Sequence, residues 1–315
     1  MKEHVLIMNS DAEWFADQLS VACPGFRYST ASGVEGALAH APAADILIGL
    51  APAISEPLIE TASSLKWVHA LTTGVDNLLN SPALSPNVAL SNSSGFHGPQ
   101  MSELAVLLML SILRDFPRML DNQKARRWER WPQPLLQGKS VCVIGVGSIA
   151  ETLAACLNAF GMTVTGVSDG RSDAPGFAAL HRRSAIGEAV GSVDFVIVLT
   201  PYTAQTHHIV GDAVLSAMDE GAILINLSRG GCVDEEAVVS HLRRGSIRAA
   251  ALDVFGTEPL PPESPLWETL GVTITPHIGG VSDNYREQVL PVVIENLNAW
   301  ASGGAAALPN RIERE

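Results

Sequence analysis

A glycine-containing turn between a strand and a helix constrains the fold of this chain more than any other feature of its sequence. Residues 145–150 read G-V-G-S-I-A and directly follow the β-branched, apolar run Ser140–Ile144. The run predicts a buried strand, and residues 151–160, which Gly161 ends, predict a helix. A second strand is expected at Thr163–Val167. Strand, glycine turn, helix and strand form the unit that binds the pyrophosphate of a dinucleotide at a helix N-terminus.

Composition and charge limit the classes of function open to this chain. Its 315 residues predict one large or two medium domains, and a hydrophobic content of 47% is enough for a substantial core. The formal net charge of -13 argues against binding to nucleic acid or to an anionic membrane, which usually requires a basic surface. It does not argue against an anionic substrate, because one local arginine can override the overall field.

Cysteine usage and the N-terminus predict a cytoplasmic protein. The four cysteines show no C-x-x-C spacing and read as reduced thiols, and we see no Cys/His cluster that predicts a metal site. Residues 1–4 lead straight into a strand-like run, without a signal peptide. The longest apolar run, 104–113, is about half of the ~20 residues that span a bilayer.

The first 95 residues alternate strand-like and helix-like segments, which predicts a parallel sheet. Thr72–Asp76 follows one of these strands, at the end where ligands of open α/β sheets bind. On chemistry alone, an ordinary strand-to-helix turn capped by Asp76 is the simpler interpretation. The expected strands cover 4–8, 45–50, 67–71 and 88–91, and the expected helices cover 12–21 and 56–63.

Three segments outside the sheets complete the expected organisation. Met101–Phe116 is apolar almost all round, which predicts a buried helix where the chain crosses between domains. Arg126–Pro132 predicts a solvated loop; the alternative is that one of its two tryptophans reaches an active site or a partner subunit. A helix over 282–301 is long enough to return to the first domain, and 303–307 is expected to be a short flexible tail.

Three charged or titratable residues follow three consecutive predicted strands of the second domain. They are Arg229, Glu258 and His277. Each alone has an ordinary interpretation: a solvated arginine, a loop glutamate or a structural histidine. We expect them together, because the carboxyl ends of parallel strands form the ligand-binding edge of a nucleotide-binding sheet. These three strands are expected at 222–226, 249–255 and 272–275, and a further strand of the same domain is expected at 194–199.

These three residue types match one reaction. When a reduced nicotinamide gives hydride to a carbonyl carbon, the oxygen needs a proton, and histidine is a natural donor near neutral pH. A carboxylate hydrogen-bonded to the histidine favours the charged imidazolium. An arginine binds a substrate carboxylate through two parallel N–H bonds, which orient the substrate as well as attract it.

Over nearly its whole length the sequence resembles the D-isomer-specific 2-hydroxyacid dehydrogenase family. The spacing of Arg229, Glu258 and His277 resembles the short glyoxylate/hydroxypyruvate-reductase-like branch. Two departures from the pattern are Ala150, in place of a third glycine, and Ser93–Phe96, in place of a more common Arg-Gly pair. The motifs that carry the resemblance are Thr73–Asp76, His97–Glu103, Gly145–Ala150, Asn226–Gly231, Ala251–Phe255, Glu258-Pro259 and Pro276–Gly280.

The resemblance implies an NAD(P)-dependent enzyme that reduces a 2-keto acid to the D-2-hydroxy acid. It implies an α/β fold of two domains, in which a doubly wound parallel Rossmann sheet is inserted into a flavodoxin-like substrate domain. The Rossmann domain would cover 98–283, and the discontinuous substrate domain would cover 1–97 and 284–315. The expected assembly is a homodimer, with no nucleic-acid or membrane partner.

The resemblance also assigns residues. Arg229 would bind the substrate carboxylate, His277 would be the general acid, and Glu258 would hold and charge it. Backbone amides around Thr73, Gly74 and Val75 would bind the other side of the carboxylate. The implied cofactor-binding residues are Gly145, Gly147, Ser148, Ile149, Ser168, Arg171, Thr200, Pro201, Asp253 and Gly279, with Asp253 anchoring the nicotinamide carboxamide.

The residues after the strand at 163–167 bear on the choice of cofactor. Ser168 occupies the position where NAD-specific members carry an acidic residue that pairs with the ribose 2′-hydroxyl. A hydroxyl accommodates a 2′-phosphate, and Arg171 could pair with that phosphate. Asp169 lies between them and would restore a preference for NAD if it bound the ribose. The loop therefore favours NADP(H) over NAD(H), with a solvated loop charge as the alternative interpretation of Arg171.

Two other functions use related folds. A corepressor-like nicotinamide-sensing scaffold would keep the glycine turn without needing turnover, and the intact Arg229, Glu258 and His277 favour an enzyme without excluding it. A formate-type dehydrogenase is expected to replace the glutamate partner and to have a longer chain. Glyoxylate, hydroxypyruvate and larger 2-keto acids all remain candidate substrates.

Overall fold

The computed structural model describes residues 2–314 and divides the chain into two compact units. One unit contains the chain up to Phe96 together with the chain from Ser282 onward, and the other contains His97–Val281. The chain therefore leaves the first unit once and returns to it once. In the described part of the chain, no helix is both long and apolar enough to cross a membrane.

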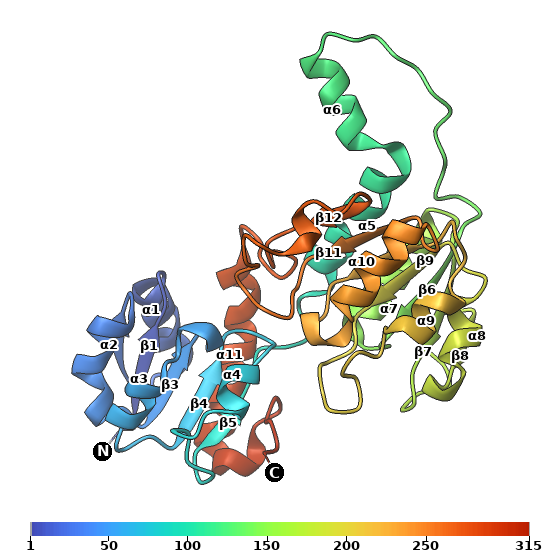
Figure 1. The fold of residues 1–315 in the computed structure, drawn as a ribbon. Coiled ribbons are helices and arrows are strands. Elements are labelled where there is room, and N and C mark those ends of the chain that lie inside the picture. The colour runs from blue at the N-terminus through green and yellow to red at the C-terminus, as the bar shows by residue number, and fades with distance from the viewer. Residues whose placement is uncertain (1, 315) are drawn as a thin grey trace. The chain divides into compact units, whose positions relative to one another are not determined.

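The first unit is built on a five-stranded parallel sheet in the order β2-β1-β3-β4-β5 (Figure 1). This is the flavodoxin-like order, as expected. The four strands predicted in this region are present. Strand β2 was missed because its sequence, RYSTA, is polar and only Ala31 is buried, as befits the edge of a sheet. The strands are β1 His4–Met8, β2 Arg27–Ala31, β3 Ile46–Gly49, β4 Trp67–Ala70 and β5 Ala89–Ser91.

Helices cover the sheet of the first unit. The long C-terminal helix α11 contributes Val289, Val293 and Leu297 to a core shared with β1 and β4. The prediction of a flexible tail at 303–307 is wrong: Gly304–Ala307 forms a 3-10 helix, and the Ile312 amide then donates to the Leu90 carbonyl at 2.8 Å. The helices are α1 Ala12–Ala22, α2 Val34–His40, α3 Glu56–Thr61, α4 Asp76–Leu79 and α11 Tyr285–Gly303.

The second unit is built on a seven-stranded parallel sheet in the order β12-β11-β10-β9-β6-β7-β8. Counted from β6, this is the Rossmann order 3-2-1-4-5-6 with one strand added, so the order reverses between β6 and β9. Strand β8 was not predicted, because it has only three residues. The strands are β6 Ser140–Ile144, β7 Thr163–Val167, β8 Ala179–His181, β9 Phe195–Val198, β10 Ile223–Asn226, β11 Ala249–Leu252 and β12 Val272–Ile274.

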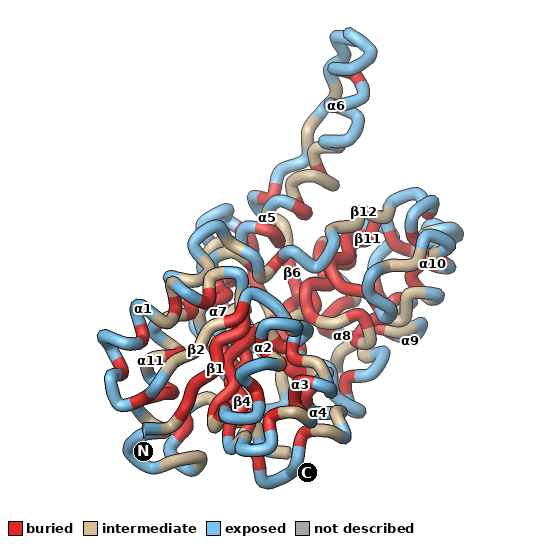
Figure 2. The backbone as a smooth tube through the Cα atoms, turned by 90° about the vertical axis from the view of Figure 1, so that its left-hand side faces the viewer, coloured by how far each residue is buried: buried red, intermediate tan, exposed pale blue. Residues whose placement is uncertain are grey.

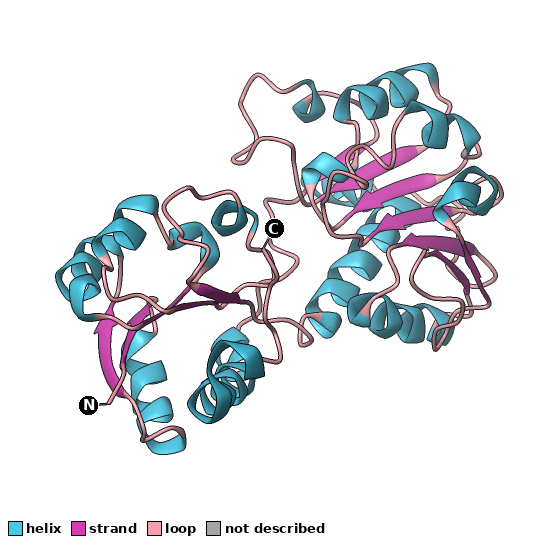
Figure 3. Ribbon diagram, turned by 90° about the horizontal axis from the view of Figure 1, so that it is seen from below, coloured by secondary structure: helices cyan, strands magenta, loops and turns pink. Residues whose placement is uncertain are grey.

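Helices pack on both faces of this sheet (Figure 3), and apolar side chains fill both interfaces. The central strands are continuous buried runs, which Figure 2 shows in red, as expected for a parallel sheet covered on two sides. This explains why the strands could be recognised from apolar runs alone. The helices are α7 Ser148–Ala159, α8 Ile186–Val190, α9 Asp212–Ala217 and α10 Glu235–Arg244.

A helical arm extends from the second unit (Figures 1 and 2). Its base, α5 (Gly98–Arg114), buries one side against the core and leaves Leu107 59% exposed, so the expected all-round burial is wrong. Asp115, at φ 54°, separates α5 from α6 (Phe116–Lys124). The following segment, Arg126–Pro132, is an irregular loop, as predicted.

Candidate active site

The glycine turn lies at the point where the strand order of the second unit reverses, between β6 and β9. Gly145 has φ +99°, and a Cβ there would lie 2.5 Å from the Thr200 backbone nitrogen. Only glycine accepts both conditions, so Gly145 is required by the fold. Gly147 differs, because its Cβ position has no heavy atom within 4 Å. The open space at Gly147 is the feature that a pyrophosphate approaching the backbone needs.

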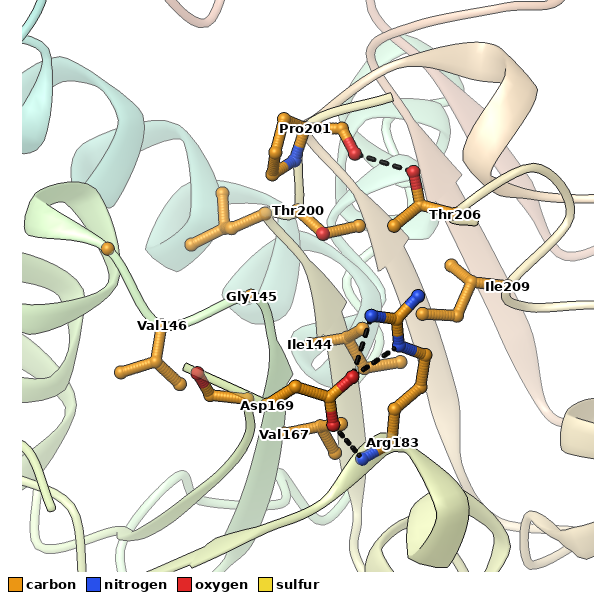
Figure 4. Close-up of a pocket in the computed structure, with 13 residues that line it drawn as sticks. Ile144, Gly145, Val146, Val167, Asp169, Arg183, Thr200, Pro201, Thr206 and Ile209 are labelled. Carbon is orange, nitrogen blue, oxygen red and sulfur yellow. Dashed lines mark hydrogen bonds and ion pairs between the residues drawn. The ribbon is translucent and has the colours of Figure 1, made fainter. Parts of the chain in front are cut away.

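A pocket of about 270 Å³ opens at the same place (Figure 4). It is formed by the carboxyl ends of β6, β7 and β9 and by the loop after β9. Ser148 and Ile149 form the first turn of α7 behind Gly147 but do not line the pocket. The hydrogen-bond donors among its lining residues and the open backbone at Gly147 fit a dinucleotide. The lining residues are Ile144, Gly145, Val146, Gly147, Val167, Ser168, Asp169, Arg183, Leu199, Thr200, Pro201, Thr206 and Ile209.

The loop after β9 shapes one wall of this pocket. The Thr206 hydroxyl donates to the Pro201 carbonyl at 2.7 Å and accepts from the Thr203 amide at 2.7 Å. The Cys232 thiol lies 3.8 Å from the Thr200 carbonyl beneath this loop, and burial raises its pKa. Thr200 and Pro201, both expected to contact the cofactor, therefore line the pocket in a loop held by its own hydrogen bonds.

Asp169 and Arg183 form an ion pair on the wall of the pocket (Figure 4). The Asp169 Oδ2 atom accepts from Arg183 Nε at 2.9 Å and from Nη2 at 2.6 Å, and Oδ1 accepts from the Arg183 amide at 2.9 Å. These bonds hold the pKa of Asp169 below its usual value. Ser168, which we expected near the ribose, also lines the pocket.

The structure does not bring Arg171 to the pocket. Its Nη1 donates to Glu151 Oε1 on α7 at 2.6 Å, and Arg171 is not a lining residue. The basic residue that lines the pocket is Arg183, which the sequence interpretation missed. The signal was present, because Arg182 and Arg183 follow β8 as Ser168 follows β7, but β8 itself had not been recognised.

His277 and Glu258 form a hydrogen-bonded pair on neighbouring loops of the second unit. Glu258 Oε2 lies 2.6 Å from His277 Nδ1, and Glu258 Oε1 accepts the Phe255 amide at 2.9 Å. Both side chains are partly exposed, Glu258 at 34% and His277 at 45%. Glu258 therefore orients the His277 ring, while the imidazole remains accessible to solvent.

Asp253 fixes the turn that carries His277. It is 1% exposed, and its carboxylate accepts from the Thr275 hydroxyl at 2.6 Å and from the amides of Ile278 and Gly279 at 3.0 and 2.9 Å. The His277 amide donates to the Asp253 carbonyl at 2.8 Å, and His277 has φ 53°. Gly279 is needed here, because a Cβ would lie 2.9 Å from Asp253 Oδ2. Asp253 and Gly279, expected at the cofactor, thus also have a structural task.

The turn that carries Arg229 is tied to the loop that carries Glu258. Asn226 Nδ2 donates to the Arg229 carbonyl at 3.0 Å, which holds the turn after β10. A Cβ on Gly230 would lie 1.8 Å from the Phe255 carbonyl carbon, so glycine permits direct backbone contact. The loops bearing Arg229, Glu258 and His277 are therefore mutually held, although no simple sequence pattern shows these contacts.

Thr73, Gly74 and Val75 belong to the first unit, in the loop after β4. The Thr73 hydroxyl donates to the Ser93 carbonyl at 2.8 Å, and Asn92 Nδ2 donates to the Thr73 carbonyl at 2.7 Å. These bonds give the loop a defined backbone. The loop connects strand β4 to helix α4, as the simpler interpretation expected, but Val75 rather than Asp76 is the N-cap and Asp76 is the first residue of the helix.

A buried histidine supports that loop from below. His69 Nδ1 lies 2.7 Å from the Ser91 hydroxyl, and Nε2 lies 3.0 Å from the Ser93 hydroxyl. Burial lowers the pKa of His69 to about 3, so the ring is neutral. The Trp67 indole also donates to the Ser91 hydroxyl, at 2.8 Å. His69 and Ser91 were not singled out in the sequence, because a histidine within a short strand carries no signal of its own.

Within residues 2–314, no group of three or more His, Cys, Asp or Glu side chains could hold a metal ion. The four cysteines are unpaired thiols, at positions 23, 142, 156 and 232.

Comparison with known proteins places these observations in a family. Residues 106–279 match the model of the D-isomer specific 2-hydroxyacid dehydrogenase NAD binding domain. A glyoxylate/hydroxypyruvate reductase B of Yersinia enterocolitica is 31% identical over 266 residues, which cover 82% of each chain. A D-isomer specific 2-hydroxyacid dehydrogenase family protein of Aeromonas salmonicida has a similar crystal structure, with 30% identity, 99% coverage of both chains and a TM-score of 0.92.

A third similar protein was solved with a cofactor. It is the NADPH-dependent glyoxylate/hydroxypyruvate reductase of Sinorhizobium meliloti, in complex with NADP and sulfate. The chain is 25% identical to it, with 99% and 98% of the two chains covered and a TM-score of 0.83.

Proposed function

Because the chain belongs to the D-isomer-specific 2-hydroxyacid dehydrogenase family, we propose that it reduces glyoxylate, hydroxypyruvate or a larger 2-keto acid to the D-2-hydroxy acid, with His277 as the general acid. The observation that carries this proposal is the 2.6 Å contact between His277 and Glu258, in the same unit as a pocket suited to a dinucleotide. A nicotinamide-sensing scaffold would need the pocket but not the pair formed by His277 and Glu258.

We assign the proton transfer of the reaction to residues of this chain. The nicotinamide cofactor supplies the hydride when it is bound. His277 Nδ1 faces Glu258, so Nε2 is the atom that donates a proton to the carbonyl oxygen during reduction and accepts it during oxidation. The carboxylate of Glu258 stabilises the charged imidazole before the proton leaves. Glu258 therefore acts through His277 as a positioning residue.

Substrate recognition is assigned to Arg229 and to the loop at 73–75. The planar guanidinium of Arg229 suits a carboxylate, which it binds through two parallel N–H bonds. Its turn is held by Asn226 and by the contact at Gly230, so the side chain starts from a defined backbone. Backbone amides of Thr73, Gly74 and Val75 are proposed as the second set of donors.

For the cofactor we propose NADP(H) in preference to NAD(H). Ser168 takes the place of the acidic residue that would repel a 2′-phosphate. Asp169, the one carboxylate that lines the pocket, is neutralised by Arg183. The binding of NADP by the Sinorhizobium meliloti relative supports the same preference.

The arm formed by α5 and α6 is the proposed dimerisation element. The arm extends from the second unit (Figure 1) and exposes Leu107, Phe116 and Leu120. Trp128, in the loop that follows α6, has 88% of its surface accessible. Apolar side chains exposed on a protruding element are typical of a protein interface. Either Trp128 or Trp131 is also proposed to reach a partner's active site.

A panel of 2-keto acids tests the enzymatic proposal. Purified protein is mixed with glyoxylate, hydroxypyruvate or a larger 2-keto acid and with NADPH or NADH, and loss of the reduced-nicotinamide absorbance is followed. The His277→Ala variant should lose about 10²–10⁴-fold in kcat while its affinity for the cofactor stays unchanged. Cofactor binding without consumption of any 2-keto acid would favour the nicotinamide-sensing scaffold instead.

A further inference from the structure

We propose that the Asp169–Arg183 pair sets the cofactor preference, and that Arg183 exchanges Asp169 for the 2′-phosphate when NADPH binds. The inference rests on the proposed use of a nicotinamide dinucleotide. It moves the phosphate-binding role from Arg171, where the sequence suggested it, to a residue that follows a different strand. It also gives Asp169 a role opposite to that of an acidic residue that selects NAD.

Arg183 lies where it can reach the ribose end of the pocket. It lines the pocket together with Ser168 and Asp169, near the carboxyl end of β7 (Figure 4). Its Nη1 atom donates to the Gln205 carbonyl at 2.9 Å, in the loop after β9. The guanidinium is thus held between the loops that follow β7 and β9.

The charges of the pair explain how it would discriminate. An Asp169 without a partner would repel a 2′-phosphate and could accept a hydrogen bond from a ribose 2′-hydroxyl, which favours NADH. When Arg183 pairs with Asp169, the carboxylate is neutralised and accepts hydrogen bonds from the guanidinium. A phosphate, which carries more charge than a carboxylate, competes for the guanidinium, whereas a hydroxyl does not.

The exposure of the pair to solvent permits this exchange of partners. The side chains of Asp169 and Arg183 are 44% and 38% accessible, and ion pairs in this environment hold their partners weakly. The loop need not move with the side chain, because Arg182 separately donates to the Asp169 carbonyl at 2.6 Å. Arg183 can therefore change partner while the backbone near Asp169 stays in place.

Arg171 provides a matched comparison within the same loop region. It pairs with Glu151 at 2.6 Å with similar exposure, 37% and 33%, but does not line the pocket. Arg171→Gln and Arg183→Gln remove the same charge from the same neighbourhood. Only the second removes a guanidinium from the pocket wall.

The test measures binding, so that it does not depend on turnover. Dissociation constants for NADPH and NADH are measured by nicotinamide fluorescence on the full-length protein, for wild type, Arg183→Gln, Asp169→Asn, the double variant and Arg171→Gln. Arg183→Gln should weaken NADPH binding by about 10-fold to 100-fold, the range expected for a lost charge-assisted contact, and should leave NADH binding unchanged or tighter. Asp169→Asn should raise the preference for NADPH, and the double variant should fall between the single ones.

Two results would overturn the inference. One is an Arg183→Gln variant that keeps the wild-type ratio of the two dissociation constants. The other is an Arg171→Gln variant that loses as much NADPH affinity as Arg183→Gln. If Arg183→Gln does not fold, Arg183→Lys provides the same test, because it keeps the charge but loses the planar fork, and should bind NADPH with intermediate affinity.

Probes without a nicotinamide separate this inference from the proposed function. 2′,5′-ADP carries the 2′-phosphate and 5′-AMP does not, so Arg183→Gln should weaken only the first. If no 2-keto acid is reduced but this difference holds, the enzymatic proposal fails and the role of Arg183 stands. If 2-keto acids are reduced but both probes bind every variant equally, the role of Arg183 fails alone.

Discussion

Glu258 reaches His277 with one carboxylate oxygen, 2.6 Å from Nδ1, while its other oxygen accepts the backbone amide of Phe255 at 2.9 Å. The backbone contact fixes the carboxylate, and the carboxylate in turn fixes the imidazole. Because Nδ1 is engaged in this way, Nε2 is the nitrogen available to a substrate.

Glu258→Gln tests whether the charge of this contact matters beyond its geometry. The amide keeps a hydrogen bond but no longer stabilises a charged imidazole, so kcat for reduction should fall by about 10-fold to 100-fold, less than for removal of the acid itself. Glu263→Gln, in an exposed part of the same loop, is the control. A kcat in Glu258→Gln that equals that of wild type would reduce Glu258 to a structural residue.

Arg229→Lys keeps the positive charge and loses the planar fork. We expect kcat/KM for 2-keto acids to fall by about 10-fold to 100-fold, because one point charge replaces two parallel hydrogen bonds. The dissociation constant of the cofactor should not change, since Arg229 does not line the pocket. Arg243→Lys, on the exposed side of α10, controls for the general effect of the exchange. Wild-type kinetics in Arg229→Lys would mean that another group binds the substrate carboxylate.

Two glycines of the same turn should respond differently to alanine. Gly145→Ala forces a side chain onto φ +99° and against the Thr200 backbone, so it should lower the free energy of unfolding by about 1–3 kcal/mol or more. Gly147→Ala meets no atom within 4 Å and should change stability by no more than about 0.5 kcal/mol, while weakening cofactor binding. Urea unfolding and nicotinamide fluorescence measure the two effects. Tight cofactor binding by Gly147→Ala would place the phosphates elsewhere.

His69 should make the protein sensitive to acid. Its pKa is lowered to about 3 in the fold, against 6.5 for an ordinary histidine, so the folded protein holds it neutral. Below about pH 6.5 the unfolded chain takes up a proton that the folded chain does not, and stability should fall by up to about 1.4 kcal/mol per pH unit until about pH 3.

The comparison that isolates His69 is one of slopes. Urea unfolding of His69→Gln between pH 4 and 6 should depend on pH less steeply than that of wild type, whatever its absolute stability. His40→Gln, at an exposed position of α2, should keep the wild-type slope. Equal slopes for all three proteins would show that His69 is protonated in the fold.

The arm predicts a dimer that a single charge can disrupt. Light scattering at micromolar concentration should give the mass of a dimer for wild type and of a monomer for Leu120→Glu, because a buried unpaired carboxylate is costly at an apolar interface. Val21→Glu, at an 82% exposed position of α1, should leave the mass unchanged. A monomeric wild type would refute the proposed assembly.

Local patterns were sufficient for the framework of both sheets. Continuous apolar runs such as Phe195–Val198 can be recognised without knowledge of their neighbours, because a strand buried on both faces is apolar throughout. The glycine turn after β6 could be recognised from its own six residues alone. Since parallel strands share a carboxyl edge, the sequence also determined that Arg229, Glu258 and His277 follow strands whose ends meet there.

Only the tertiary structure decided which charged and polar groups are partners. Arg171 was predicted to contact the cofactor, but it forms an ion pair with Glu151. Arg183 instead lines the pocket, where it forms an ion pair with Asp169. Without recognition of β8, the sequence patterns did not distinguish these arginines, because each partner lies in a different element whose position depends on the packing of the whole unit. Strands β2 and β8, short or polar at the sheet edges, are specified by pairing with a neighbouring strand rather than by their own residues.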